Sequence, residues 1–220
     1  ELADISQPLK PGQLFNSNTY SLAAHVLDCG ASPKILGIAR DQVPALTEKI
    51  RQGLDTDLLI TSGGVSMGDY DMVKEVLSKE GEITFWTVRM KPGKPLAFGV
   101  FNTATGRKVP HLGLPGNPVS AMITFELFAR PAIFKMMGKQ NRNRPIIQCT
   151  IEDALKNQDG RRIYARVRVM QRDGQYFARL TGPQGSGILT SMAQANALAI
   201  ISEDITQVRE GDRIPVMLLE

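Results

Sequence analysis

The sequence is poor in residues on which several common kinds of site depend. Its 220 residues include two cysteines, Cys29 and Cys149, two histidines and one tryptophan. Two cysteines far apart in the chain support neither a disulfide framework nor a cysteine-rich zinc site. His25 falls in a predicted helix and His111 in a predicted strand, so no nucleophilic triad is predicted. Trp86 lies in an apolar strand and is expected in the core.

Long hydrophobic runs are also missing. No apolar stretch reaches the roughly 18 residues that a membrane span needs, and the N-terminus has no signal pattern. We therefore expect a cytoplasmic protein without a membrane partner. The first residue is Glu rather than Met, which is expected of a segment or a processed chain.

The positive charge is local. The chain has a net charge of +4, but residues 139–172 hold nine Lys or Arg against three acids, so the rest of the chain is negative. This basic segment lacks the interleaved aromatic residues that bind single-stranded nucleic acid. A solvated face or one anion site explains it, and no nucleic-acid partner is predicted.

The first part of the chain alternates between strand and helix patterns. A helix is predicted after Asn16 or Asn18, either of which can cap it, and a second helix after Asp41, ending at Gly53. Pro131 is expected to kink or split the last helix. The remaining predicted elements are strands at residues 35–39, 57–61, 83–90, 96–101 and 109–114 and helices at 72–77 and 119–137. This alternation is typical of an α/β domain with a largely parallel sheet.

The polar segment 139–145 separates this part from a tail of short strands. The strands are predicted at residues 146–151, 164–171, 175–180, 197–201 and 214–219, with a turn at Arg172-Asp173-Gly174. We therefore expect two domains, an α/β domain at residues 1–140 and a small barrel or sandwich at 141–220.

The loop SGGVSMGDYD (residues 62–71) begins where a buried strand ends. Ligands bind at that edge of open α/β sheets, and glycines let backbone N–H groups approach an anion. The loop has neither the nucleotide P-loop nor the dinucleotide pattern. A tight structural turn is the alternative, and the two serines and two acids favour a site.

Acids beside an anion site need a cation between them and the ligand. Mg²⁺ prefers carboxylate and phosphate oxygens, so Asp71 is a candidate metal ligand, whereas capping the helix is the commoner role for Asp69. For Asp41 the two roles, helix cap and metal ligand, remain open.

Two further loops can bind an anion. MKPGKP (residues 90–95) presents two lysines from a stiff, proline-bracketed segment, although a solvated turn fits equally well. GLPGNPVSA (residues 113–121) repeats the strand-to-helix pattern and places Ser120 in the first helical turn, where a plain helix start is the alternative.

These three motifs, in this order and followed by GPQGSGILTSMAQANAL at residues 182–198, resemble the molybdopterin molybdenumtransferases, the family of bacterial MoeA and the gephyrin E domain. The resemblance implies a three-layer molybdopterin-binding domain of the MogA/MoaB type, with a mostly parallel sheet, followed by a small all-β barrel-like domain. It implies the C-terminal half of a longer homodimeric enzyme, so that the segment alone can be inactive.

The resemblance also implies the reaction: Mg²⁺-dependent insertion of molybdate into adenylylated molybdopterin, giving molybdenum cofactor and AMP. A molybdopterin adenylyltransferase is a possible partner. The implied catalytic and metal-binding acids are Glu1, Asp41 and Asp71. The implied contacts of the pterin phosphate and adenylate are Ser62, Gly63, Gly64, Ser66, Asp69, Pro115, Gly116, Asn117, Pro118 and Ser120. The implied molybdate contacts are Ser66, Lys91, Lys94, Pro95, Arg166 and Ser191.

Two other functions are compatible with the same motifs. A scaffold module, like the gephyrin E domain, would use a groove in the β-domain to anchor a partner, but the acids and Lys94 favour chemistry. Molybdopterin adenylyltransferases catalyse the preceding step and lack the second domain, so residues 146–220 argue against that activity.

Overall fold

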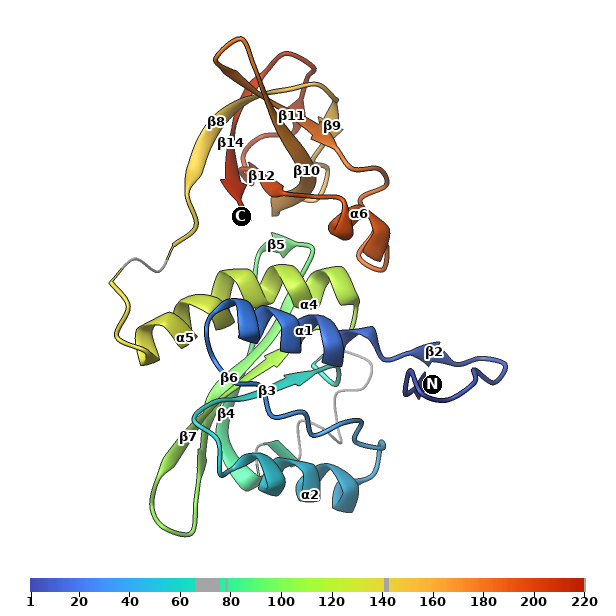
Figure 1. The fold of residues 1–220 in the computed structure, drawn as a ribbon, viewed down its shortest axis with the longest axis vertical. Helices are drawn as coiled ribbons and strands as arrows, with labels where there is room; N and C mark the ends of the chain where they lie inside the picture. Colours follow the sequence, from blue (N-terminus) through green and yellow to red (C-terminus); the bar gives the residue numbers. More distant parts are fainter. Residues whose placement is uncertain (66–75, 78, 141–142, 220) are drawn as a thin grey trace.

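A four-stranded sheet forms the centre of the first part of the chain. The computed structural model describes residues 1–65, 76–77, 79–140 and 143–219 (Figure 1). The sheet order is β3 (Leu59–Ser62), β7 (Lys108–Leu114), β6 (Pro95–Asn102) and β4 (Gly81–Thr87). β3 and β7 run parallel, whereas β7–β6 and β6–β4 are antiparallel.

The expectation of a mostly parallel sheet is therefore wrong for the described strands. The predicted strand at residues 35–39 is irregular, because Gly37 takes a left-handed φ of 78° in its middle. The turn between β6 and β7 is closed by the Thr103 N–H, which donates to the Arg107 carbonyl at 2.9 Å. Parallel neighbours need a long crossover, and neither this hairpin nor the short link from β4 to β6 supplies one.

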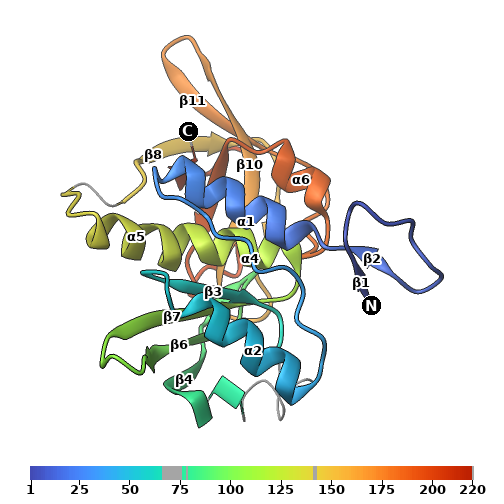
Figure 2. The ribbon, with the colours of Figure 1, turned by 60° about the horizontal axis from the view of Figure 1, so that its bottom comes forward.

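Helices cover both faces of this sheet and make a three-layer arrangement (Figures 1 and 2). On one face lie α1 (Ser17–Asp28), α4 (Pro118–Thr124), the π-helical turn η1 (Phe125–Ala129) and α5 (Arg130–Met136). The core between these helices and the sheet includes Leu22 and Phe125 from the helices and Leu96, Leu112 and Leu114 from the strands. On the other face α2 (Val43–Gly53) packs through Ile50 against Leu59, Phe101 and Val109. The three layers confirm that part of the predicted fold class.

The helix ends follow local sequence signals. Asn16 caps α1, since its side-chain oxygen accepts from the Thr19 N–H, which decides between Asn16 and Asn18. The N-cap of α2 is Gln42, so Asp41 does not cap that helix. Before Pro131 the predicted helix changes to the π-helical turn η1, but the backbone stays helical at Ala129 and Arg130, so the chain is not broken there.

The tail forms a closed five-stranded barrel. Its strands are β8 (Ile146–Ile151), β10 (Arg162–Arg172), β11 (Gln175–Leu180), β12 (Ala197–Ile201) and β14 (Arg213–Leu218). They pair in the order β11-β8-β14-β12-β10, and β10 pairs back to β11. Asp173 and Gly174 have φ values of 48° and 75°, as the predicted two-residue turn requires. The sequence did not reveal β9 (Leu155–Lys156), β13 (Gln207–Val208) or α6 (Leu189–Ala193).

One strand pairing joins the two parts. β5 (Met90–Lys91) extends the barrel sheet by running parallel to β10, with Met90 opposite Arg162 and Lys91 opposite Ile163. A shared apolar cluster lies beside it, formed by Met90, Val119, Ile123, Met192, Leu198 and Met217. The loop at residues 90–95, called the lysine loop below, is therefore fixed to the barrel as well as to the α/β part. The expected boundary between residues 140 and 141 stays a prediction.

Other sequence expectations concern the cysteines, Trp86, His25 and membrane-spanning helices. Cys29 and Cys149 are buried free thiols, in agreement with the absence of a disulfide framework. Trp86 is 57% exposed on the edge strand β4, so its expected place in the core is wrong. His25 stacks on Phe125 and lies in α1. Among the described residues, no helix is both long enough and apolar enough to cross a membrane.

His111 is a buried base that makes stability depend on pH. Its Nε2 lies 3.0 Å from the Thr61 hydroxyl, its Nδ1 has no partner among the described residues, and burial lowers its pKa to about 4. The unfolded chain binds this proton below the ordinary pKa of 6.5, whereas the folded chain binds it only near pH 4. The contribution of neutral His111 to stability is therefore complete above pH 6.5 and is lost as pH falls towards 4.

We expect the titration of His111 to lower the free energy of unfolding by about 3 kcal/mol between pH 6.5 and 4. Urea unfolding of wild type and His111→Leu at both pH values measures the difference, because other titrating groups are common to both proteins. An equal fall in the two proteins would contradict the prediction.

Candidate functional site

An open cleft of about 2020 Å³ runs along the loops of the α/β part and reaches the barrel. The structure brings most of the residues predicted for the site to its walls. They are Glu1, Asp41, Ser62, Gly63, Gly64, Lys91, Lys94, Pro95, Pro115, Gly116, Asn117, Pro118 and Ser120. Ser66, Asp69 and Asp71 lie outside the described residues.

The first wall is the turn that follows β3. Gly63 and Gly64 have φ values of 88° and 66°, a region that side chains with a Cβ rarely adopt. The Gly63 N–H donates to the Leu114 carbonyl at 3.0 Å, which ties this turn to the end of β7. Glycine is needed at both positions because the backbone turns sharply at the C-terminal end of β3.

The second wall is the loop from β7 to α4. A Cβ added to Gly116 would lie 3.5 Å from the Gly63 Cα. The turn at residues 62–64 and the loop at residues 115–118, called the two glycine loops below, are therefore in contact. Pro118 stands at the start of α4, where its missing N–H costs no helical hydrogen bond. Ser120 is buried in the first turn of that helix. The two predicted loops thus form one continuous backbone surface.

The lysine loop forms the third wall. Gly93 has a φ of 102°, and a Cβ there would lie 2.5 Å from the Thr124 hydroxyl, so only glycine lets the loop sit on α4. The Val88 N–H donates to the Lys94 carbonyl at 2.8 Å and closes the loop. Lys94 has no acidic partner among the described residues, whereas Lys91 pairs with Asp159 at 3.3 Å.

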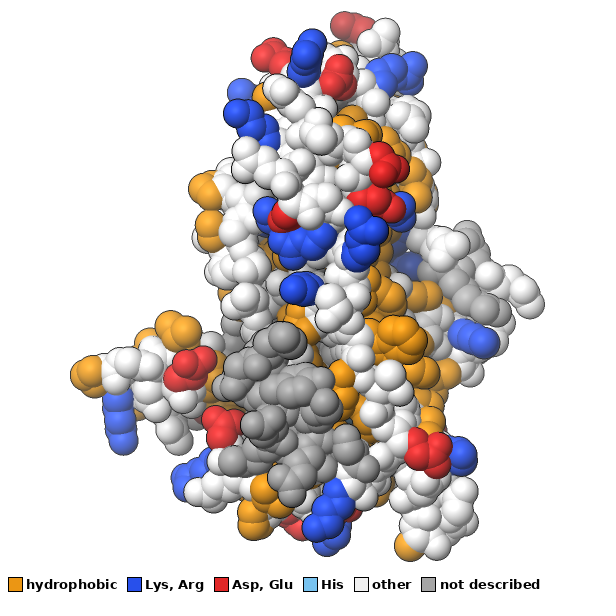
Figure 3. All heavy atoms as spheres, turned by 180° about the vertical axis from the view of Figure 1, so that it is seen from behind, with side chains coloured by type: hydrophobic (Ala, Val, Ile, Leu, Met, Phe, Trp, Pro, Cys, Tyr) orange, Lys and Arg blue, Asp and Glu red, His pale blue; other side chains and the backbone are white. Residues whose placement is uncertain are grey.

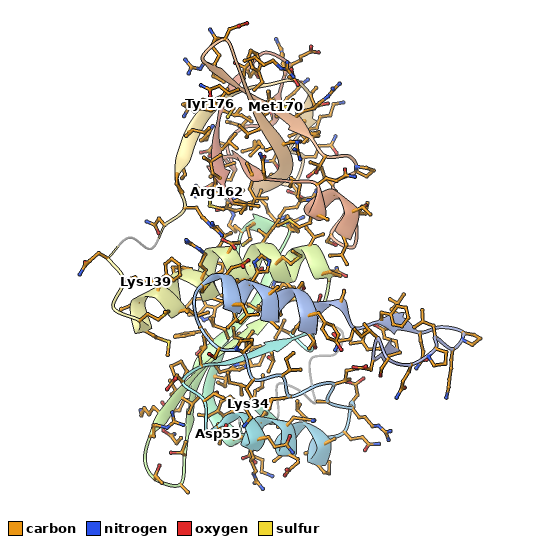
Figure 4. All side chains as sticks on the ribbon, in the orientation of Figure 1. Lys34, Asp55, Lys139, Arg162, Met170 and Tyr176 are labelled. Carbon is orange, nitrogen blue, oxygen red and sulfur yellow. The ribbon has the colours of Figure 1, made fainter. Side chains whose placement is uncertain are left out.

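The barrel supplies residues that the sequence did not single out. Arg161 lines the cleft, and its guanidinium lies 2.5 Å from the Asp159 carboxylate. Hydrogen bonds from Arg161 first, and then from Lys91, lower the pKa of Asp159 to about 2. The Arg161-Arg162 pair within the basic segment 139–172 was the available signal. Figure 3 shows Lys and Arg side chains gathered where the two parts meet, with acids among them, and Figure 4 labels Arg162 at that junction.

The structure does not bring Arg166 and Ser191 to the cleft. Arg166 is 1% exposed, and its Nε donates to the Ser191 hydroxyl at 3.0 Å. Its other N–H groups donate to the backbone carbonyls of Pro183, Gln184 and Gly185 at 3.0–3.1 Å. Burial lowers the pKa of Arg166 to about 10. This guanidinium holds residues 183–185, two of which line the cleft, and Arg166 itself does not line it.

Comparisons with known proteins agree with this architecture. The family model described as a probable molybdopterin binding domain matches residues 2–135, and the model for the MoeA C-terminal region (domain IV) matches residues 148–219. The chain is a member of the molybdopterin molybdenumtransferase (MoeA) family. The two matches correspond to the α/β part and the barrel, and confirm the resemblance drawn from the loop motifs.

Members of this family are similar to the chain along its whole length. Molybdopterin molybdenumtransferase of Nostoc sp. is 39% identical over 100% of the chain and 51% of that protein. Molybdopterin molybdenumtransferase 2 of Mycobacterium tuberculosis is 36% identical over 98% of the chain and 53% of that protein. The molybdopterin biosynthesis MoeA protein structure from Pyrococcus horikoshii is 26% identical, with a TM-score of 0.82 over 100% of the chain and 52% of that structure. The chain spans about half the length of these relatives.

The described residues hold two of the acids expected to bind a metal. No group of three or more His, Cys, Asp or Glu side chains that could hold a metal occurs among residues 1–65, 76–77, 79–140 and 143–219. Glu1 and Asp41 both line the cleft, and carboxylates are suitable ligands for Mg²⁺. These two acids alone do not make a metal site.

Proposed function

We propose that the chain is the part of a molybdenumtransferase that binds adenylylated molybdopterin and molybdate, and that the whole protein converts them to molybdenum cofactor and AMP. The observation that carries this proposal is the cleft, where two glycine loops and a lysine loop share one surface. Backbone N–H groups suit phosphates, and lysines suit a tetrahedral oxyanion. Family membership supplies the molybdopterin as the chemistry to fit.

The residues take separate roles in this proposal. Ser62, Gly63, Gly64 and the loop from Pro115 to Ser120 bind the pterin phosphate and the adenylate, together with Ser66 and Asp69. Lys91, Lys94 and Pro95 hold molybdate. Glu1, Asp41 and Asp71 are the proposed acids, with Mg²⁺ as the proposed cation. Preorganised positive charge in the cleft stabilises the negative charge that develops as the phosphoanhydride bond breaks.

The proposal extends to the assembly. We propose that the whole protein is a homodimer, and that an adenylyltransferase supplies its adenylylated substrate. Neither the scaffold reading nor adenylyl transfer is favoured by a described feature of the cleft, and the barrel remains the feature that separates the chain from the adenylyltransferases.

The direct test is AMP release by the full-length protein. It is supplied with adenylylated molybdopterin and Mg²⁺, with and without molybdate, and AMP is followed by chromatography. We expect release to be stimulated by molybdate and to cease in Asp71→Ala, which should still bind the pterin. Release that does not respond to molybdate would contradict the proposal.

Lys94→Ala should raise the molybdate concentration for half-maximal AMP release about tenfold or more, because a hydrogen bond to a charged group contributes about 1.5–3 kcal/mol. The matched control is Lys108→Ala, an exposed lysine at the far end of β7. An unchanged molybdate dependence in Lys94→Ala would remove this lysine from the oxyanion site.

A further inference from the structure

Asn18 connects the two glycine loops. It lies in the first turn of α1, and its side-chain Nδ2 donates to the Ser62 hydroxyl at 2.6 Å and to the Gly116 carbonyl at 2.7 Å. Ser62 follows 44 residues later and Gly116 follows 98 residues later in the chain. One amide group therefore joins three segments that are distant in sequence.

The Ser62 hydroxyl continues this network. It accepts from Asn18 and donates to the Pro115 carbonyl at 3.1 Å. Asn18 and Ser62 together thus make three hydrogen bonds between α1, the turn after β3 and the loop before α4. Chained hydrogen bonds of this kind strengthen one another. They act where Gly63 and Gly116 are in contact, so they set the separation of two walls of the cleft.

The helix does not need Asn18 for its own start. Asn16 already caps α1 through the Thr19 N–H. Within a helix, asparagine is a poorer residue than alanine. The Asn18 Oδ1 is also sheltered from solvent and has no hydrogen-bond partner among the described residues, although most buried polar atoms have one. Such a residue is typical of a place where function sets the sequence.

We infer that Asn18 is a positioning residue: it holds the loop at Ser62 and the loop at Gly116 at the separation that the substrate's phosphate and adenylate require. This inference rests on the proposed function. It assigns Asn18 no contact with the reacting atoms. Its effect is exerted through the backbone N–H groups of the two loops, whose direction decides how well an anion fits.

The test compares Asn18→Ala with Asn16→Ala in the full-length protein. Asn16→Ala removes the cap and should lower the melting temperature while leaving the two loops joined. Asn18→Ala should lower the melting temperature less, and should weaken the binding of adenylylated molybdopterin about tenfold, since small misplacements of binding groups are costly. Titration calorimetry with Asp71 intact and molybdate absent measures the dissociation constant.

A second variant separates the donor role from side-chain size. Asn18→Asp keeps the shape and suits the first turn of a helix, but it cannot donate to Gly116. It should weaken binding at least as much as Asn18→Ala. The losses from Asn18→Ala and Ser62→Ala should be less than additive, because both interrupt one network.

Hydrogen exchange separates this inference from the proposed function. In Asn18→Ala, the amides of residues 62–64 and of Gly116, Asn117 and Val119 should exchange faster, by about tenfold, while the barrel is unchanged. This result is expected whether or not the protein releases AMP. Unchanged exchange in both loops would overturn the inference, as would substrate binding equal to wild type. Failure of molybdate-stimulated AMP release, with faster loop exchange, would overturn only the proposed function.

Discussion

Arg166→Ala is expected to lower the free energy of unfolding by about 3–4 kcal/mol, because four acceptors lose a buried, charged donor at once. The acceptors are the Ser191 hydroxyl and the carbonyls of residues 183–185. Ala165 and Val167 point into the barrel core, so Arg166 lies on the outer face of β10, covered by that segment. Lysine cannot replace it, since one ammonium group cannot reach a set of acceptors that is spread around a planar guanidinium.

The loss should extend beyond the barrel. Residues 183–185 lead to Ser186, whose carbonyl accepts from the Val119 N–H at 3.1 Å and whose hydroxyl accepts from Asn117 at 3.1 Å. Releasing this segment frees one wall of the cleft, so substrate binding should weaken as well. Urea unfolding of Arg166→Ala and of Arg168→Ala, an exposed arginine on the same strand, checks the prediction. Equal stabilities would show that the hydrogen bonds of Arg166 contribute little.

Glu126→Ala should lower the free energy of unfolding by about 3–5 kcal/mol, the loss expected when one member of a buried ion-pair group is removed. The Glu126 side chain is 2% exposed in the π-helical turn. Its carboxylate lies 3.0 Å from Arg144, 3.8 Å from Arg130 and 3.4 Å from the His25 Nδ1. Without the carboxylate, these side chains are left together with too little negative charge.

The same group anchors the connection to the barrel. Arg144 belongs to the segment 139–145, and Lys139 at its start, labelled in Figure 4, donates to the Cys29 carbonyl at 2.9 Å. Both contacts hold the connecting chain against α1 and the helical turn before α5. Loss of Glu126 should therefore loosen the connection as well as the α/β core.

The pH dependence of Glu126 has a definite sign. Burial raises the pKa of its carboxyl group, but hydrogen bonds from His25 and Arg144 and their charges outweigh burial, so the pKa lies below its ordinary value of 4.5. Its contribution is therefore complete above pH 4.5 and is lost as pH falls further. Urea unfolding of wild type, Glu126→Ala and the exposed Glu210→Ala at pH 7 and below pH 4 measures both effects. A wild-type advantage that persists at the lower pH would contradict the assignment.

Local sequence signals predicted the elements well where local physics determines them. The cap at Asn16 and the turn at Asp173-Gly174 each depend on a few neighbouring residues, and both are present. The apolar run at residues 35–39 has a strand-like composition, but it runs irregularly along the cleft. Composition alone cannot show whether an apolar segment finds a neighbouring strand.

The site was predictable in its loops and not in its long-range contacts. Glycines and prolines at residues 62–64, 90–95 and 113–118 marked the cleft, because those residues are needed where backbone approaches a ligand or another loop. The partners of Arg166 lie 17 to 25 residues away, and those of Asn18 lie farther still. No periodicity encodes such contacts, so Arg166 was expected at the oxyanion and Asn18 only as a cap.

The central claim is that molybdate binds in this cleft beside the lysine loop. A crystal structure of the full-length protein with AMP and tungstate, a heavy tetrahedral oxyanion like molybdate, tests it directly through anomalous scattering of tungsten. The account predicts one tungsten peak in the cleft within hydrogen-bonding reach of Lys94, with AMP against the loops at Ser62 and Gly116. A tungsten peak outside the cleft, at a concentration that competes with molybdate in AMP release, would contradict it.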